Sequence, residues 1–145
     1  MTLWIVLLLL ALLLSPLAWL MPSRRQRGRM ELRLAARRMG LAMQLSAQDW
    51  PHWLPQEPPS PCAQYHRARR AGRTDSWCYW QVAPGQWLNR WREPCADAAL
   101  LAQLASLPAD VFKVEAGQQM IALCWGERGE QEALQRIAAL LTALA

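Results

Sequence analysis

The chain begins with an uncharged apolar run, from Leu3 to Leu20, that constrains its fold more than any other feature. As an α-helix these residues span about 27 Å, which is close to the thickness of the hydrocarbon core of a bilayer. The run has no polar stripe in any helical phase, so a soluble domain would have to surround it completely. The rest of the 145-residue chain is too small to do so. The sequence therefore predicts a transmembrane helix rather than a buried core helix.

A cleaved signal peptide is the main alternative for this run. Signal peptides start with basic residues and end in a small-x-small cleavage site. Only Met1 and Thr2 precede the run, and its end, residues 19–22, offers no such site. We expect an uncleaved anchor over residues 1–22, with Trp4 and Trp19 in the headgroup layer at its two ends.

The charge asymmetry around the run predicts its orientation. No Lys or Arg precedes the run, whereas several arginines follow it directly. Basic residues stay on the cytoplasmic side, so the sequence predicts a single-pass bacterial inner-membrane protein with a periplasmic N-terminus and a cytoplasmic C-terminal domain. The arginines would also meet the anionic inner leaflet, and a specific lipid or RNA site on them is an alternative. The residues predicted to lie at the membrane interface are Trp4, Trp19, Arg24, Arg25, Arg27 and Arg29.

The formal net charge of +5 comes from one short block. Residues 24–38 hold seven arginines against Glu31, and the other residues sum to −1. Basicity next to an apolar run is typical of a membrane address, so nucleic acid is not the favoured partner. The length leaves room for one membrane segment and one small domain, which excludes a large multidomain enzyme.

Residues 23–40 are predicted to form a basic juxtamembrane amphipathic helix that ends at Gly40. Residues 41–145 would then form a small cytoplasmic α+β domain. Its segment 50–62 holds five prolines and cannot be regular structure. Trp50 and Trp53 indicate that this Pro-rich loop folds back onto the domain, although a polyproline ligand for a partner is an alternative.

The remaining pattern predicts a mostly antiparallel sheet with helices packed on one side. Apolar periodicity favours helices over 97–107 and 130–144. Residues 86–92 fit either a helix or a strand, and we favour a strand. Two of the predicted strands, 63–68 and 77–82, are joined by a turn around residues 72–76. Besides 86–92, the predicted strands are 41–45, 63–68, 77–82, 111–115 and 120–125.

The four cysteines have no spacing typical of a zinc or dithiol site. Cys62, Cys78, Cys95 and Cys124 are 16, 17 and 29 positions apart. In a cytoplasmic domain these thiols would be reduced, with Cys78 and Cys124 acting as small core residues. A thiol or metal site on Cys62, His66 and Cys95 is the least favoured hypothesis.

The chain has no phosphate-loop or dinucleotide motif, in addition to lacking a typical cysteine spacing. We therefore predict no metal, no cofactor, no catalytic residues and no enzymatic activity.

Seven tryptophans lie outside the anchor, and several are interleaved with arginine. Trp and Arg dominate the binding energy of protein interfaces, so this pattern favours a protein partner. The candidate partner-binding residues are Arg67, Arg69, Arg70, Arg73, Trp87 and Trp91.

The sequence therefore predicts an accessory or scaffold subunit that binds an integral-membrane protein complex. The alternative is a membrane-tethered binder of nucleic acid or anionic lipid that uses the same arginines and tryptophans. In layout the chain resembles the single-span auxiliary subunit of the Sec translocase. No motif ties that resemblance to particular residues, so it implies no site and no activity. The oligomeric state and the identity of the partner complex stay open.

Overall fold

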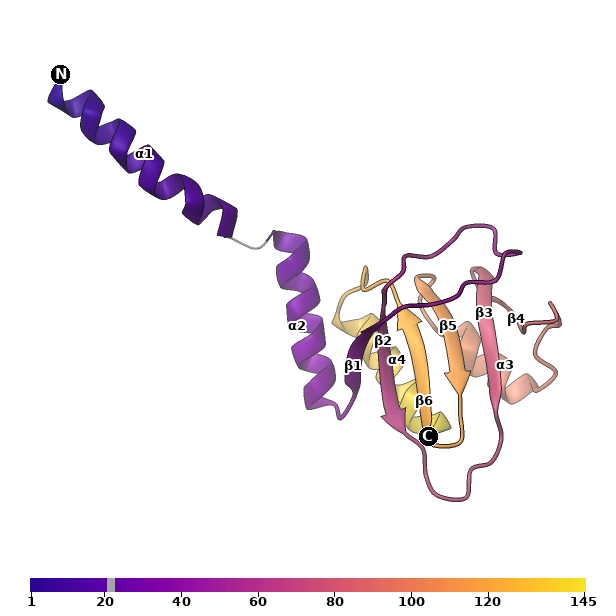
Figure 1. Cartoon of the computed structure of the whole chain (residues 1–145). Helices are drawn as coiled ribbons and strands as arrows, with labels where there is room; N and C mark the ends of the chain where they lie inside the picture. Colours follow the sequence, from indigo (N-terminus) through magenta and orange to yellow (C-terminus); the bar gives the residue numbers. More distant parts are fainter. Residues whose placement is uncertain (21–22) are drawn as a thin grey trace. The chain divides into compact units, whose positions relative to one another are not determined.

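The computed structural model describes residues 1–20 and 23–145 and contains two compact units, Met1–Glu31 and Leu32–Ala145. The last two residues of the predicted anchor, 21 and 22, lie outside the described residues. Helix α1, Thr2–Leu20, makes up most of the first unit (Figure 1). Helix α2, Arg24–Arg38, runs across the boundary between the two units.

Helix α1 confirms that the N-terminal apolar run is helical. It has 19 residues, none of them buried, and an 18-residue stretch within it has a mean hydropathy of 2.6. Pro16 lies inside the helix, where it has no backbone N–H to donate. By length and composition this helix can cross a membrane.

Helix α2 begins with a capping box. The Ser23 hydroxyl accepts a hydrogen bond from the Gln26 backbone N–H at 3.2 Å, and the Gln26 side chain accepts one from the Ser23 backbone N–H at 3.1 Å. The helix ends at Gly40, whose φ of 83° is in the left-handed region that glycine adopts without strain. Leu32 and Ala36 are buried against the domain. The compact unit therefore starts at Leu32 rather than at residue 41, because the apolar stripe of α2 is part of the core.

An open antiparallel sheet of six strands forms the centre of the second unit, in the order β1-β2-β6-β5-β3-β4 (Figure 1). This confirms the α+β class. The strands are β1 (Ala42–Ser46), β2 (Cys62–Ala68), β3 (Trp77–Ala83), β4 (Gln86–Leu88), β5 (Val111–Ala116) and β6 (Met120–Trp125).

Two details of the sheet differ from the sequence prediction. Strands β2 and β3 are consecutive in the sequence but are not neighbours, because the β5–β6 hairpin lies between them. β6 is buried along nearly its whole length, and such a strand is stable only where both of its faces are covered. In addition, β4 stops at Leu88, and the chain then turns around Asn89 instead of continuing as a strand to residue 92.

Helices α3 (Ala98–Ala105) and α4 (Gln131–Leu144) cover one face of the sheet (Figure 1). Asp97 caps α3, because its carboxylate accepts hydrogen bonds from the N–H groups of Ala99 and Leu100. Burying each large aliphatic side chain of such a core stabilises the fold by roughly 1.5–3 kcal/mol. The largest fully buried side chains are Trp87, Trp125, Tyr65, Leu104, Ile121, Leu123, Leu134, Ile137 and Leu141.

The Pro-rich segment between β1 and β2 packs on the opposite face of the sheet. The ring of Trp50 meets that of Phe112 edge-on at 6.1 Å, and the ring of Trp53 meets that of Trp80 edge-on at 6.0 Å. Lys113 donates a hydrogen bond to the Gln48 side chain at 3.1 Å. These contacts confirm that the segment folds back onto the domain, so both faces of the sheet are covered.

Candidate functional site

Trp87 was predicted to contact a partner, and this prediction is wrong. Only 1% of the residue is exposed, and it packs in the hydrophobic core. Side chains alternate along a strand, and in β4 the middle one of three faces inward. Trp87 is therefore a core residue that a partner cannot reach in this fold.

Arg69 was also predicted to lie on the surface, but its side chain is 1% exposed. Its guanidinium pairs with the Asp75 carboxylate at 2.7 Å and donates to the Gly117 carbonyl at 2.9 Å. The hydrogen bond from Arg69 holds the pKa of Asp75 below its usual value. Arg69 thus fixes the loop between β2 and β3 and is not free to bind a partner.

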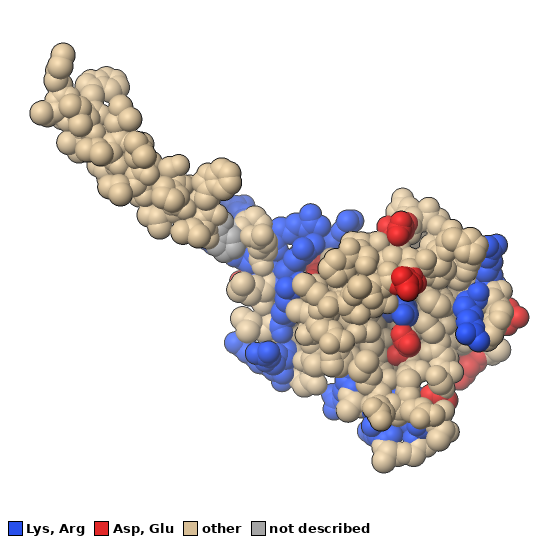
Figure 2. Space-filling view, viewed as in Figure 1, with Lys and Arg blue, Asp and Glu red and all other residues tan. Residues whose placement is uncertain are grey.

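The other predicted arginines do not form one surface with Trp91. Arg67 is half-buried and donates a hydrogen bond to the Thr142 hydroxyl at 3.3 Å, whereas Arg70 and Arg73 are exposed in the β2–β3 loop. Three strands separate β2 from β4, which at about 4.8 Å per strand is roughly 19 Å. Figure 2 shows Lys and Arg in several separate groups, with Asp and Glu between them on the domain.

Of the two predicted tryptophans, Trp91 is the one that the structure leaves accessible, with 64% of it exposed. The Arg90 guanidinium lies 4.1 Å from its ring centroid, within the range of a cation–π contact. Both residues line a hollow of about 450 Å³ beside strand β3, which we call the Trp91 hollow. Its other walls come from Asn89, from Ser76 and residues 77–80 of β3, and from Glu115 and Ala116 of β5.

The turn that carries Trp91 is held in place by Asn89. The Asn89 side-chain oxygen accepts hydrogen bonds from the backbone N–H groups of Trp91 and Glu93, both at 3.0 Å. Arg92 completes the turn with a φ of 60°, a left-handed conformation that is uncommon outside glycine. The exposed indole is therefore presented by an ordered turn, which lowers the entropy lost when a partner binds.

The charges around the Trp91 hollow are partly balanced within the protein. Lys113 pairs with Glu115 at 2.9 Å, and the Lys113 ammonium also lies 5.8 Å from the Trp80 ring. Burial raises the pKa of the Cys78 thiol in the same region to about 12, so this thiol is neutral at physiological pH. Arg90 takes part in none of the ion pairs found in the described residues.

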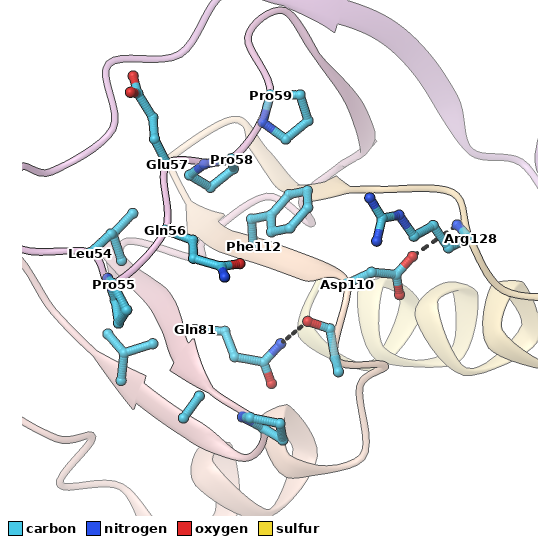
Figure 3. A pocket seen from close by; sticks show the side chains of 14 residues that line it. Leu54, Pro55, Gln56, Glu57, Pro58, Pro59, Gln81, Asp110, Phe112 and Arg128 are labelled. Atoms are coloured by element: carbon cyan, nitrogen blue, oxygen red, sulfur yellow. Dashed lines mark hydrogen bonds between the residues drawn. The ribbon is translucent and has the colours of Figure 1, made fainter.

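A second concavity lies between the Pro-rich segment and the ends of β3 and β5 (Figure 3). It has a volume of about 600 Å³ and is walled by residues 54–59 and 81–84 and by Ala109, Asp110, Phe112 and Arg128. Gln81 donates hydrogen bonds to backbone carbonyls, including that of Ala109, and Asp110 accepts one from the Arg128 backbone N–H at 2.9 Å. Gln81 therefore ties β3 to the loop before β5, and Asp110 ties that loop to the loop after β6.

The structure also contains a buried ionic cluster that the sequence analysis did not predict. The Arg33 guanidinium donates two hydrogen bonds to the Glu127 carboxylate, at 2.8 and 2.9 Å, and the Tyr65 hydroxyl donates a third at 2.7 Å. The Glu127 side chain is 4% exposed, and burial raises the pKa of Tyr65 above its usual value. This cluster joins α2 to β2 and to the β6–α4 loop. Arg33 and Glu127 are 94 positions apart, so no local sequence signal connects them.

The thiol and metal hypothesis placed Cys62, His66 and Cys95 together, and the structure separates them. Cys95 packs in the core on the helix side, whereas Cys62 points to the other face of β2, where its thiol lies 3.7 Å from the Trp125 carbonyl oxygen. Residues four apart in a strand are about 13 Å from each other, so His66 is also distant from Cys62. Within residues 1–20 and 23–145, no group of three or more Cys, His, Asp or Glu side chains is arranged to hold a metal ion.

Cys62 instead lies beside Cys124, which the sequence spacing did not indicate. The Cys124 thiol donates a hydrogen bond to the Cys62 sulfur, and this bond together with burial raises the pKa of Cys124. Both residues are buried, so we assign them to packing.

The predicted interface arginines lie in the first turns of α2. Arg24, Arg25 and Arg27 are exposed, and Trp4 and Trp19 are exposed near the two ends of α1. Basic side chains next to an apolar helix can reach lipid headgroups where such a helix crosses a membrane.

Comparison with known proteins assigns no family: no family model matches the chain, and neither curated proteins nor solved structures gave a match.

Proposed function

We propose that this protein is a single-pass membrane accessory subunit that binds an integral-membrane protein complex through its α+β domain. The observation that carries this proposal is α1, a helix of 19 residues that is uncharged and has no buried residue. Leaving so many apolar side chains in water is unfavourable, so a bilayer is the environment that suits them. A folded domain that follows such a helix is held at the membrane surface, where membrane proteins are its nearest partners.

We place the protein in a bacterial inner membrane, with the N-terminus in the periplasm and the domain in the cytoplasm. Support comes from the arginines at the start of α2 and from the lack of basic residues in α1. Basic residues next to a span are retained on the cytoplasmic side. Protease treatment of intact spheroplasts and of inverted vesicles tests this orientation: the domain should be digested only in inverted vesicles, and digestion in spheroplasts would contradict it.

Trp91 and Arg90 support a protein as the partner. Trp and Arg are the residue types most enriched at binding hot spots, and here they stack together on an ordered turn. The alternative, a binder of nucleic acid or anionic lipid, needs several arginines and aromatic rings on one face. That surface loses Arg69 and Trp87 to the interior, so the protein partner is the better supported proposal.

Photo-cross-linking in cells tests the proposal. The full-length chain carries p-benzoylphenylalanine in place of Trp91, and a matched chain carries it in place of Arg136, which is exposed on α4. We expect the protein to remain in membranes after a carbonate wash and to form one dominant cross-link to an integral-membrane protein from position 91 but not from 136. Release by carbonate, or cross-links from position 91 only to RNA or lipid, would overturn the proposal.

A further inference from the structure

Half of strand β3 has no partner on its outer side. β3 pairs with β5 from Trp77 to Trp80, but on the other side it pairs with β4 only at Trp80, Gln81 and Ala83. Over Trp77–Tyr79 the sheet therefore ends at β3. In the described residues, the backbone of Trp77–Tyr79 forms no hydrogen bond outside the ladder with β5. An edge of this kind presents unpaired N–H and C=O groups to a further strand.

The space beside this edge is open. The Trp91 hollow, about 450 Å³, lies between residues 76–80, at the start of β3, and the turn that holds Asn89, Arg90 and Trp91. The turn is closed by its own hydrogen bonds, including that from the Asn89 N–H to the Glu93 carbonyl at 3.0 Å, so it does not use the edge of β3. A strand added at the edge would thus have free backbone groups on one side and the exposed Trp91 ring close by.

The charge of the hollow restricts what this strand can be. Glu115 is already paired with Lys113, whereas Arg90 is paired with none of the carboxylates in the described part of the chain. The unbalanced charge at the hollow is therefore positive. A segment with an acidic residue beside Arg90 and an apolar residue against Trp91 would complement both side chains.

We propose that the outer edge of β3 at Trp77–Tyr79 binds an extended, acidic peptide segment of the partner protein as an additional strand. In this mode backbone hydrogen bonds supply affinity and alternate side chains supply specificity. The inference rests on the proposed function in one respect, namely that the partner is a protein. It adds the mode of recognition and the chemical class of the recognised segment.

Binding of designed peptides to the purified full-length protein in detergent tests strand addition. The probe is a capped heptapeptide of alternating valine and aspartate, and the matched control has lysine in place of aspartate. Two further peptides carry N-methyl groups on either the valines or the aspartates, which removes alternate N–H donors. Successive N–H groups of a strand point to opposite sides, so only one of these two sets faces the edge.

We expect the lysine peptide to bind at least tenfold more weakly than the aspartate peptide, and only one of the two N-methylated peptides to lose binding by a similar factor. Hydrogen exchange should slow when the aspartate peptide binds, at those amides of Trp77–Tyr79 that point away from β5. Arg90→Glu should remove the preference for aspartate, whereas Arg136→Glu, an exposed change on α4, should leave it within twofold of the wild type.

Equal binding of both N-methylated peptides, or unchanged preference in Arg90→Glu, would overturn strand addition by an acidic segment. This experiment needs no native partner, so its failure is separate from that of the proposed function. A cross-link from position 91 to a membrane protein, combined with negative peptide results, overturns the strand mode alone. Positive peptide results without that cross-link overturn the accessory-subunit function alone.

Discussion

The Glu127 carboxylate is predicted to be the most important single charge in the domain. Glu127 accepts two hydrogen bonds from Arg33 and one from Tyr65, and its own φ is 57°. A left-handed backbone costs a residue with a side chain of the order of 1 kcal/mol or more. The side-chain contacts must offset this cost for Glu127 to hold the conformation. Replacing the carboxylate should therefore weaken the whole attachment of α2 to the sheet.

We expect Glu127→Gln to lower the free energy of unfolding by about 2–3 kcal/mol. Removing one partner of a buried ion pair costs about 3–5 kcal/mol. The Arg33 side chain is 33% exposed, so water can solvate part of the guanidinium left unpaired. The expected loss of unfolding free energy is smaller for this reason. Tyr65→Phe removes one hydrogen bond to a charged acceptor, for which we expect about 1.5 kcal/mol.

Urea unfolding of the full-length chain in detergent, followed by tryptophan fluorescence, measures these changes. The loss expected for Glu127→Gln corresponds to a fall in Tm of roughly 8–12 °C. Glu57→Gln removes an exposed carboxylate in the Pro-rich segment and should change the unfolding free energy by less than about 0.5 kcal/mol. The double variant of Glu127 and Tyr65 should lose less than the sum of the two single losses, since both act in one cluster. If Glu127→Gln unfolds within about 0.5 kcal/mol of the wild type, the cluster does not stabilise the fold and the reasoning fails.

Three further predictions follow from other parts of the domain. A methyl group on Gly129 would lie 2.6 Å from the Ala133 methyl, so Gly129→Ala should cost about 1–3 kcal/mol in thermal or urea unfolding, and a neutral effect would contradict this packing. Arg69 lowers the pKa of folded Asp75 below its unfolded value, so the pair stabilises the fold above about pH 4 and the benefit disappears as pH falls through the folded pKa. Asp75→Asn should therefore be less stable than the wild type at pH 7, and the difference should shrink as the pH falls below about 4; a pH-independent difference would refute the assignment. Burial raises the pKa of Cys78 to about 12, so as pH rises the thiol ionises in the unfolded chain before it does so in the folded one. The free energy of unfolding should therefore fall by up to about 1.4 kcal/mol per pH unit above about pH 9. Cys78→Ala should show a shallower fall, and a slope identical to that of the wild type would contradict the assignment.

Local periodicity was enough to predict most elements of the fold. The apolar run of α1, the stripes of α3 and α4 and the β5–β6 hairpin each follow from spacings within a few residues. Strand order did not follow in the same way, because it depends on which strand can be buried on both faces. β6 is buried on both faces and β3 is not. Which strand is buried in this way depends on how all six strands and the covering segments pack, so local spacing does not predict it.

The candidate site shows the same limit. Trp87 and Trp91 share a face in either a helix or a regular strand, so periodicity gave them the same role. The strand ends between them, at Leu88, and Asn89 then redirects the chain through its side-chain hydrogen bonds. Trp87 is consequently buried and Trp91 exposed. Asn is a common turn residue, but a single one does not show where a strand stops.

Covering both faces of the sheet leaves its edges as the places where a partner strand can bind. Helices α3 and α4 pack on one face and the Pro-rich segment on the other, so an added layer would have to displace one of them. The two edges differ in what they offer. Strand β1 exposes Leu45, with 60% of the residue accessible, whereas the β3 edge combines unpaired backbone groups with a hollow, an exposed Trp91 and an unpaired Arg90. Aromatic and guanidinium groups contribute more binding energy per residue than a single leucine. We therefore expect a partner to be recognised mainly at the β3 edge. When the full-length protein is purified together with its membrane partner, Trp91→Ala should weaken their association by tenfold or more, whereas Leu45→Ala should leave it nearly unchanged.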